Sequence, residues 1–264
     1  MLYPILAALA PAIIGAIYIY TRDKSAPEPA KLLLKAFGYG VVSIGVTMLI
    51  VAPLSYMGIV PDEIRSFGDS VTTSFLGAAL PEEIAKFLML MLLLKKHRNE
   101  FDQYIDAVVY AAFVALGFAA IENIMYVIGS EDWTTVAVTR ALLAVPGHML
   151  YGVIMGYYVS LALFMPQRKG HYLTLAVAVP VLAHGFYDVM ALSSGVIDEG
   201  LALVMMALLI FFVSRLWKYC IKIIKRHNEA DQKAKAEAEA AEEEERKLDS
   251  ANNNIDKNDC YGGK

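Results

Sequence analysis

The sequence has little of what disulfide-stabilised, nucleic-acid-binding or nucleophile-dependent proteins need. Of its 264 residues only two are cysteine, Cys220 and Cys260, which argues against a disulfide framework. The formal net charge is −4 and no basic face is present, so a nucleic-acid partner is not expected. Gly-x-Ser-x-Gly, His-Glu-x-x-His and phosphate-binding glycine loops do not occur in the sequence. Serine hydrolases, the commonest zinc proteases and nucleotide-binding proteins therefore have no sequence signal here.

What the sequence has in quantity is apolar side chains. They make up 57% of the chain, and the mean hydropathy is +0.48. These values exclude an ordinary soluble domain and predict an all-α, polytopic transmembrane helical bundle. Hydrophobic windows predict about seven spans of roughly 20 residues, namely 2–20, 33–54, 71–94, 104–128, 134–164, 172–193 and 200–221. The first has no positively charged start, so it is interpreted as a retained span rather than a signal peptide.

The loops between these spans alternate in charge. Basic residues follow the first, third, fifth and seventh spans, and acidic residues dominate the opposite loops, where Arg65 is the main exception. Under the positive-inside rule, the amino terminus is outside and the carboxyl terminus is cytoplasmic. We divide the chain into a seven-span membrane domain, residues 1–226, and a charged tail, 227–264. The tail is expected to be partly helical, then disordered, and to serve solubility rather than binding.

Ionisable residues lie inside the apolar segments, foremost Glu82, Glu83 and Lys86 in the third span. A charge at the bilayer centre costs at least about 2.5–3.5 kcal/mol, so such residues are functional candidates by default. Pro81 precedes the pair and frees a backbone carbonyl one turn earlier, which must find a partner or face a cavity. Glu82 and Lys86 could simply neutralise each other. Because Glu83 points about 100° away, we expect that one lysine does not serve both carboxylates.

Two histidines from other spans reach a similar depth. His148 follows Pro146-Gly147, where we expect the long fifth span to be kinked, tilted or broken, and His184 lies in the sixth span. Asp188 shares a helix face with His184 and could orient its ring, although such a pair is also a common packing hydrogen bond. Further polar groups lie toward the exterior, namely Glu122, Asn123 and Arg140. The joint occurrence of these residues favours a functional site.

This combination of residues predicts amide hydrolysis without a serine or cysteine nucleophile. A glutamate in an apolar cavity can take a proton from water, one histidine can position that water, and another can stabilise the oxyanion. No cofactor is expected, although Glu82, His148 and His184 could instead hold zinc. Two other classes remain open. An ion-coupled transporter also uses midplane acids and broken helices, and a membrane scaffold would depend on the charged tail.

Six motifs occur in a fixed order between about residues 75 and 190. They are Pro81-Glu82-Glu83-Ile84-Ala85-Lys86, Asp106-x-x-x-Tyr110, Gly117-Phe118-x-x-x-Glu122-Asn123-x-x-Tyr126, Arg140, Gly147-His148 with Gly152, and His184-Gly-Phe-Tyr-Asp188. This ordered set resembles the PrsW family of intramembrane proteases, which is similar in its core to the membrane CAAX prenyl endopeptidases. The resemblance implies an integral protein of the bacterial cytoplasmic membrane that cleaves a membrane-anchored protein or peptide.

The resemblance also implies a role for each matched residue. Glu82 would be the general base, Glu83 a supporting acid, and His148 would share the water. His184 with Asp188 would stabilise the oxyanion, but Asp188 stands where the CAAX enzymes usually have asparagine. An ionised aspartate cannot donate to an oxyanion, so we expect Asp188 either to orient His184 or to stay protonated. Supporting roles are implied for Lys86, Glu122, Asn123 and Arg140. The implied reaction is site-1 cleavage of an anti-sigma-factor-like regulator on the exterior side.

Overall fold

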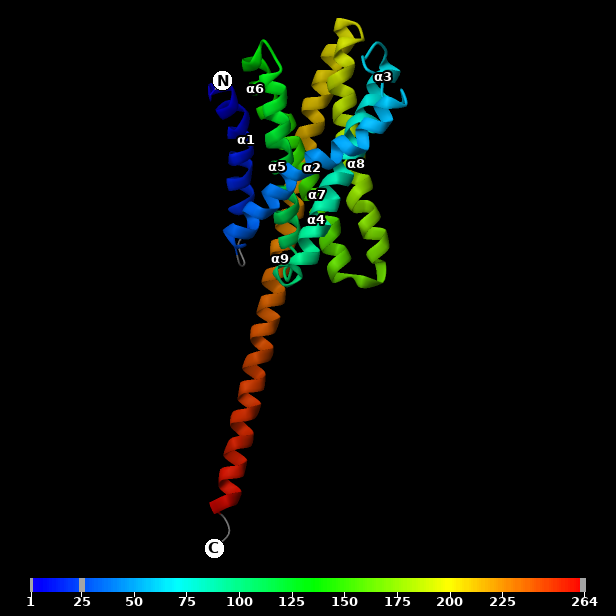
Figure 1. Cartoon of the computed structure of the whole chain (residues 1–264). Helices are drawn as coiled ribbons and strands as arrows, with labels where there is room; N and C mark the ends of the chain where they lie inside the picture. Colours follow the sequence, from blue (N-terminus) through cyan, green and yellow to red (C-terminus); the bar gives the residue numbers. More distant parts are fainter. Residues whose placement is uncertain (1, 24–26, 262–264) are drawn as a thin grey trace.

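The computed structural model describes residues 2–23 and 27–261, and side chains as far as residue 247. Figure 1 shows an all-helical molecule, and the described residues contain no strand. The main elements are α1 (Leu2–Tyr20), α2 (Ala30–Tyr56), α3 (Phe67–Thr72), the π-helix η1 (Thr73–Ala79), α4 (Leu80–Lys96), α5 (Asp106–Ile128), α6 (Trp133–Leu142), α7 (Ala144–Phe164), α8 (Lys169–Leu192) and α9 (Glu199–Tyr261). Three short 3-10 helices connect them: η2 (Arg98–Glu100), η3 (Pro166–Arg168) and η4 (Ser193–Gly195). The predicted all-α class is confirmed.

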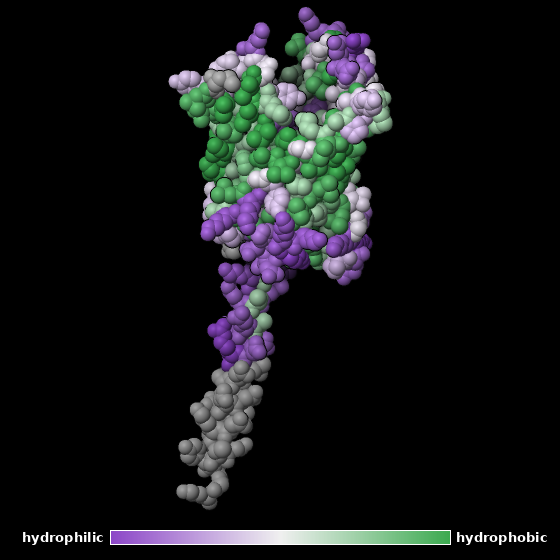
Figure 2. Space-filling model, viewed as in Figure 1, coloured by the Kyte–Doolittle hydropathy of each residue, from purple (hydrophilic) through white to green (hydrophobic). Residues whose placement is uncertain are grey.

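Six helical segments of the described chain are long and apolar enough to cross a membrane. They are α1, α2, α5, the α6–α7 pair, α8 and the first part of α9. The remaining predicted span corresponds to the continuous run of α3, η1 and α4, which carries Glu82, Glu83 and Lys86. On the face shown in Figure 2, apolar surface covers the middle of the body and polar surface lies at both ends, as a bilayer requires. The count of seven spans and the orientation stay predictions.

Helix α5 lies at the centre of the bundle, where it contacts α1, α2, α4, α6 and α7. It is apolar on nearly every face, as expected for a helix surrounded by others. It crosses α2 closely, where Gly40 meets the backbone around Val114 and Gly117 meets Phe37. A Cβ atom at either glycine would collide with the opposite backbone. Because glycine has no side chain at these two positions, α2 and α5 can approach each other closely.

The helices are irregular near both prolines that the sequence singles out, but the break in the fifth span differs from the prediction. The fifth span is broken at Leu143, between α6 and α7, rather than at Pro146-Gly147. Pro146 instead sits in the first turn of α7, where its missing N–H is not needed. In the third span, Pro81 is the second residue of α4, which directly follows the π-helix. There the N–H of Leu80 donates to the carbonyl of Phe75, five residues back. Single-turn π-helices are frequent at functional sites.

Helix α9 leaves the membrane body and continues as a long extension (Figure 1). Where it leaves, the side-chain amide of Asn228 donates to the carbonyl of Arg22 at 3.0 Å. The carboxylate of Asp231 accepts the backbone N–H groups of Tyr104 and Ile105 at 2.7 and 3.0 Å. The body contacts of α9 thus reach Asp231. The sequence predicts disorder for the Asn/Asp-rich end of the tail. In the structure α9 continues through this part to Tyr261, and residues 262–264 lie outside the described residues.

Candidate functional site

One lysine joins both glutamates of the acidic pair. The ammonium nitrogen Nζ of Lys86 donates to Glu82 Oε2 at 3.2 Å and to Glu83 Oε1 at 2.8 Å. The expectation that one lysine would not serve both carboxylates is therefore wrong. At about 100° per residue, Lys86 lies roughly 40° around the helix from Glu82 and thus between the two glutamates. Positions three and four residues apart are neighbours on a helix surface, so both glutamates reach the same ammonium.

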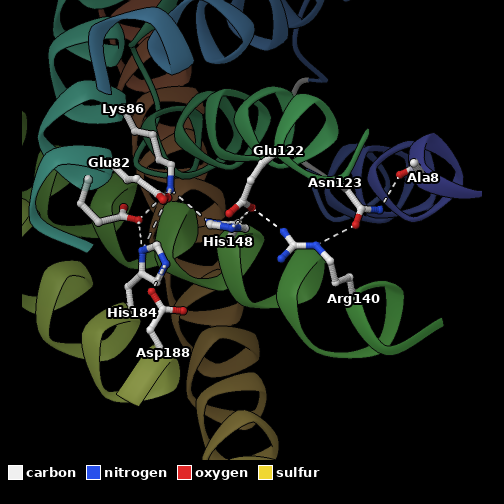
Figure 3. Close-up of polar contacts among 10 residues, drawn as sticks. Ala8, Glu82, Lys86, Glu122, Asn123, Arg140, His148, His184 and Asp188 are labelled. Atoms are coloured by element: carbon white, nitrogen blue, oxygen red, sulfur yellow. Dashed lines mark hydrogen bonds and ion pairs between the residues drawn. The ribbon is translucent and has the colours of Figure 1, made fainter. Parts of the chain in front are cut away.

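The third partner of Lys86 comes from another helix. Its Nζ lies 3.1 Å from Nδ1 of His148 on α7, and the ring of Phe118 on α5 lies beneath it, with the centroid at 4.0 Å. Only 1% of Lys86 is exposed. An ammonium has three N–H groups and here it has three acceptors. This buried charge is thus fully hydrogen-bonded (Figure 3), which is the condition under which a buried charge is tolerated.

The contact with Lys86 fixes the tautomer of His148. Because an ammonium can only donate, Nδ1 of His148 accepts and its proton is on Nε2. That nitrogen donates to Glu122 Oε2 at 2.8 Å. Glu122 also accepts from Nη2 of Arg140 at 2.6 Å. From the sequence, Glu122 is expected to have only a supporting role. In the structure it contacts His148 directly.

Beyond Glu122 the polar contacts continue to α1. Nε of Arg140 donates to Oδ1 of Asn123 at 2.9 Å, and Nδ2 of Asn123 donates to the backbone carbonyl of Ala8 at 2.8 Å. The Arg140 guanidinium also lies over the ring of Tyr126, 4.0 Å from its centroid. Figure 3 shows this chain running from α1 through α6 to the histidine. Arg140 and Asn123 therefore hold Glu122 in place.

His184 on α8 lies between two carboxylates. Its Nδ1 is 2.9 Å from Glu83 Oε1, and its Nε2 is 3.3 Å from Asp188 Oδ2. The predicted contact between His184 and Asp188, spaced four residues apart, is confirmed. The rings of His148 and His184 lie close together, with centroids 5.0 Å apart. The predicted meeting of the acidic pair with both histidines is therefore also confirmed.

A cavity of about 550 Å³ opens beside these residues. One wall is polar and the other is apolar. The polar wall includes Glu82, Glu122, Arg140, His148, His184 and Asp188, and the apolar wall includes Ile44, Met48, Val51 and Ile64. The apolar residues of α2 follow its close crossing with α5 at Gly40, and the second half of α5 also lines the cavity. Glu82 is 7% exposed and lines the cavity, whereas Glu83 is fully buried behind it.

Sequence reasoning missed Tyr151. Its ring stacks on that of His184, with centroids 5.0 Å apart and an interplanar angle of 19°. It lines the cavity, is 1% exposed, and its hydroxyl has no hydrogen-bond partner among the described residues. Gly147 leaves room for this hydroxyl, because a Cβ there would lie 3.2 Å from it. The spacing His148-x-x-Tyr151 would have placed both side chains on one helix face.

Two motif residues do not join the site. The hydroxyl of Tyr110 contacts the carboxylate of Glu28, and Asp106 accepts the N–H of Gln103 at 2.6 Å. Both lie near the first half of α5, at the end of the bundle opposite to Glu122 along that helix. Their contacts tie α5 to the segment before α2. The motif Asp106-x-x-x-Tyr110 therefore has a structural place outside the cavity.

An all-helical membrane bundle with paired carboxylates and two histidines around a cavity has the arrangement of an intramembrane hydrolase. Comparison with known proteins identifies the family. Residues 28–214 match the family model described as PrsW family intramembrane metalloprotease. The chain belongs to this family. It is a peptidase and an integral protein of a bacterial membrane.

Several proteins with the name Protease PrsW are similar to the chain. The one from Bacillus subtilis (strain 168) is 39% identical over 183 residues, which cover 69% of this chain and 79% of that protein. The one from Geobacillus kaustophilus is 36% identical over 69% of this chain and 76% of its own length. The one from Oceanobacillus iheyensis is 34% identical over 87% of this chain and 98% of its own length. No solved structure matches the chain.

The family description names a metalloprotease, so we tested whether the site fits a metal. Glu82, Glu83, His148 and His184 offer ligand atoms within 4.8 Å of one another, and carboxylates with imidazoles suit zinc. However, Glu82 Oε2, Glu83 Oε1 and His148 Nδ1 already converge on Lys86 Nζ. The donors are therefore of the right chemical kind, but with Lys86 in its place the centre does not fit a metal ion.

Proposed function

We propose that the chain hydrolyses a peptide bond of a membrane-anchored protein with water activated by Glu82. The observation that carries this proposal is the difference between the two glutamates. Glu82 lines the cavity, whereas Glu83 is sealed behind it and bonded to Lys86 and His184. A general base must reach the water that it deprotonates. Glu82 can do so, and Glu83 acts as the support that holds Lys86 and His184.

The two histidines then act mainly through orientation. His148 is bonded to Lys86 and Glu122, so it fixes one side of the site where the water is held. His184 faces a carboxylate with each ring nitrogen, so Asp188 can orient it, which is the role expected from the chemistry of an ionised aspartate. An oxyanion formed near His184 would have to compete with these carboxylates. A further donor would therefore help to stabilise the tetrahedral intermediate.

We propose that the hydroxyl of Tyr151 is this donor. It lies beside His184 on the cavity wall and has no partner among the described residues. A buried hydroxyl without a partner is costly, unless substrate supplies the missing acceptor. An oxyanion hole needs a donor that is already in place before the charge develops. Tyr151 meets this requirement because its ring is fixed by stacking on His184.

The cavity also favours a substrate that approaches from one side of the membrane. It extends along the second half of α5, from Phe118 through Glu122 to Tyr126. In the predicted orientation this half faces the exterior. We therefore propose that a single-span protein, such as an anti-sigma-factor-like regulator, is cut near the outer leaflet in a site-1 cleavage. Its scissile segment would lie between the apolar wall of α2 and the polar wall.

The test compares cells that contain the native chain with cells that contain Glu82→Gln, which keeps the volume but removes the base. Loss of a general base costs typically about 10²- to 10⁴-fold in rate. Quantitative proteomics of membranes should therefore show one or a few single-span proteins that accumulate uncut in the variant. The matched control is Glu242→Gln on the exposed part of α9, which should behave as the native chain. Cleavage at the native rate by Glu82→Gln would show that the proposed base is wrong.

A further inference from the structure

We propose that the ammonium of Lys86 permanently fills the position of a catalytic metal, and that its removal opens a zinc site. Four residues could hold a metal, namely Glu82, Glu83, His148 and His184. The first three contact the ammonium, and His184 contacts Glu83 beside it. These four residues come from α4, α7 and α8, so three helices meet at this point. A cation at this meeting point holds two carboxylates side by side. Here that cation is part of the chain.

The atoms that contact the ammonium, and their distances from it, support this interpretation. Lys86 Nζ meets Glu83 Oε1 at 2.8 Å, His148 Nδ1 at 3.1 Å and Glu82 Oε2 at 3.2 Å. Each of these atoms is one that a zinc ion would use, at a shorter distance of about 2.0–2.2 Å. A zinc ion and the ammonium cannot share the three lone pairs. The two cations therefore exclude each other from the same place.

Lys86 also has a strong reason to stay in place. Lys86 is 1% exposed, and its ammonium also lies against the ring of Phe118, in addition to its three acceptors. If a metal displaced it, the ammonium would lose all three acceptors within an apolar bundle, and an unpaired buried charge is strongly destabilising. Lys86 also lies on the same helix as the two glutamates, so its ammonium is always close to their carboxylates. A metal ion from solution would have to overcome both this proximity and the cost of leaving the ammonium unpaired.

Without the ammonium the balance reverses. Glu82 and Glu83 would be two buried carboxylates with no cation on the same helix turn, close to the acceptor nitrogen of His148. Such a site gains a great deal from a divalent cation, because the charges that repel each other would then be bridged. The geometry of the four donors is already set by the packing of their helices. Lys86 is thus a positioning residue that also decides which cation the site accepts.

Metal content of the purified protein tests this inference without any turnover. The full chain, with any affinity tag removed, is incubated with zinc in detergent and then freed of loosely bound metal. We expect well below one zinc per native chain and about one zinc per chain for Lys86→Ala, the stoichiometry of a single site. Lys86→Arg keeps a cation and should remain metal-poor. Lys86→Ala/His148→Ala should lose the zinc again, because one ligand is then missing.

Two further measurements keep the test decisive. Cobalt replaces zinc as a probe, and its visible absorption should appear in Lys86→Ala and not in the native chain. Zinc should raise the melting temperature of Lys86→Ala, or of Lys86→Met if the alanine variant does not fold, and leave that of the native chain unchanged. About one zinc in the native chain that is lost in His148→Ala would overturn the inference. So would folded Lys86→Ala or Lys86→Met protein that binds no zinc. Because no cleavage is measured, either result is independent of the proposed peptidase mechanism.

Discussion

At the scale of single residues, helix spacing explains how three charges coexist inside the bundle. Lys86 follows Glu82 by four residues and Glu83 by three, so its ammonium lies between the two carboxylates. Glu83 then has a second contact, to His184, and is sealed from the cavity. Two adjacent glutamates thus have different surroundings. This difference is the reason why we propose Glu82 as the base and Glu83 as its support.

The first residue-scale prediction concerns Tyr151. Replacement by phenylalanine keeps the ring that stacks on His184 and removes only the hydroxyl. If the hydroxyl stabilises the oxyanion, kcat should fall by about 10²- to 10³-fold, as with other lost oxyanion donors, while KM changes little. The assay uses purified protein and a substrate found by the Glu82→Gln comparison. Tyr157→Phe, a tyrosine on the same helix that packs on His227 away from the cavity, is the control.

A change in KM alone for Tyr151→Phe would assign the hydroxyl to substrate binding instead. The melting temperature supplies a second check. The hydroxyl has no partner among the described residues, so its removal should not lower stability. A large loss of stability would show that the hydroxyl has a structural role.

Much of the site could be predicted from single residues. Glu82, His148 and His184 stand out because charged or titratable side chains are rare in apolar segments, and Asp188 follows from its spacing to His184. Tyr151 could not be found in this way, because a tyrosine is an ordinary residue in a membrane helix. The contact of Glu122 with His148 depends on how α5 and α7 pack. Sequence spacing within one helix carries no such information.

At the scale of helices, apolar run length predicted the elements well because a bilayer imposes it. The ends of α1 agree with the predicted span, 2–20. The sequence predicts the break at Pro146-Gly147, but it lies at Leu143. A proline fits into the first turn of a helix as easily as it causes a kink, so its position alone does not locate the break. The π-helix before Pro81 was also beyond reach. It depends on the register in which the whole segment packs against α2 and α8.

The element-scale prediction concerns the contact of α9 with the start of α5. Asp231 accepts two backbone N–H groups, from Tyr104 and Ile105, as a capping residue would. Asp231→Ala removes both bonds and should destabilise the protein by about 1–2 kcal/mol, the usual cost of a lost cap. Thermal unfolding of the purified protein measures this. The control is Glu229→Ala, two residues earlier and exposed. Equal melting temperatures for the two variants would contradict the capping role.

At the scale of the whole molecule, the family match and the polar network have different extents. The match begins at residue 28 and leaves out α1. Yet the carbonyl of Ala8 on α1 holds Asn123, which holds Arg140. Helix α1, outside the matched range, is therefore connected to His148 through three hydrogen-bonded residues, Asn123, Arg140 and Glu122. In contrast, the extended part of α9 carries mostly exposed ion pairs within one helix, such as Lys233 with Glu237 and Lys247 with Glu243.

These differences predict the outcome of two truncations. Exposed pairs spaced four residues apart contribute little to stability, so a chain that ends at residue 231 should keep its melting temperature and its peptidase activity. A chain that ends at residue 221 also loses Asn228 and Asp231, which contact Arg22 and the start of α5. It should be clearly less stable. If the chain that ends at residue 231 stayed folded but no longer cleaved substrate, the tail would have to bind a substrate or partner. The functional division proposed between residues 1–226 and 227–264 would then be wrong.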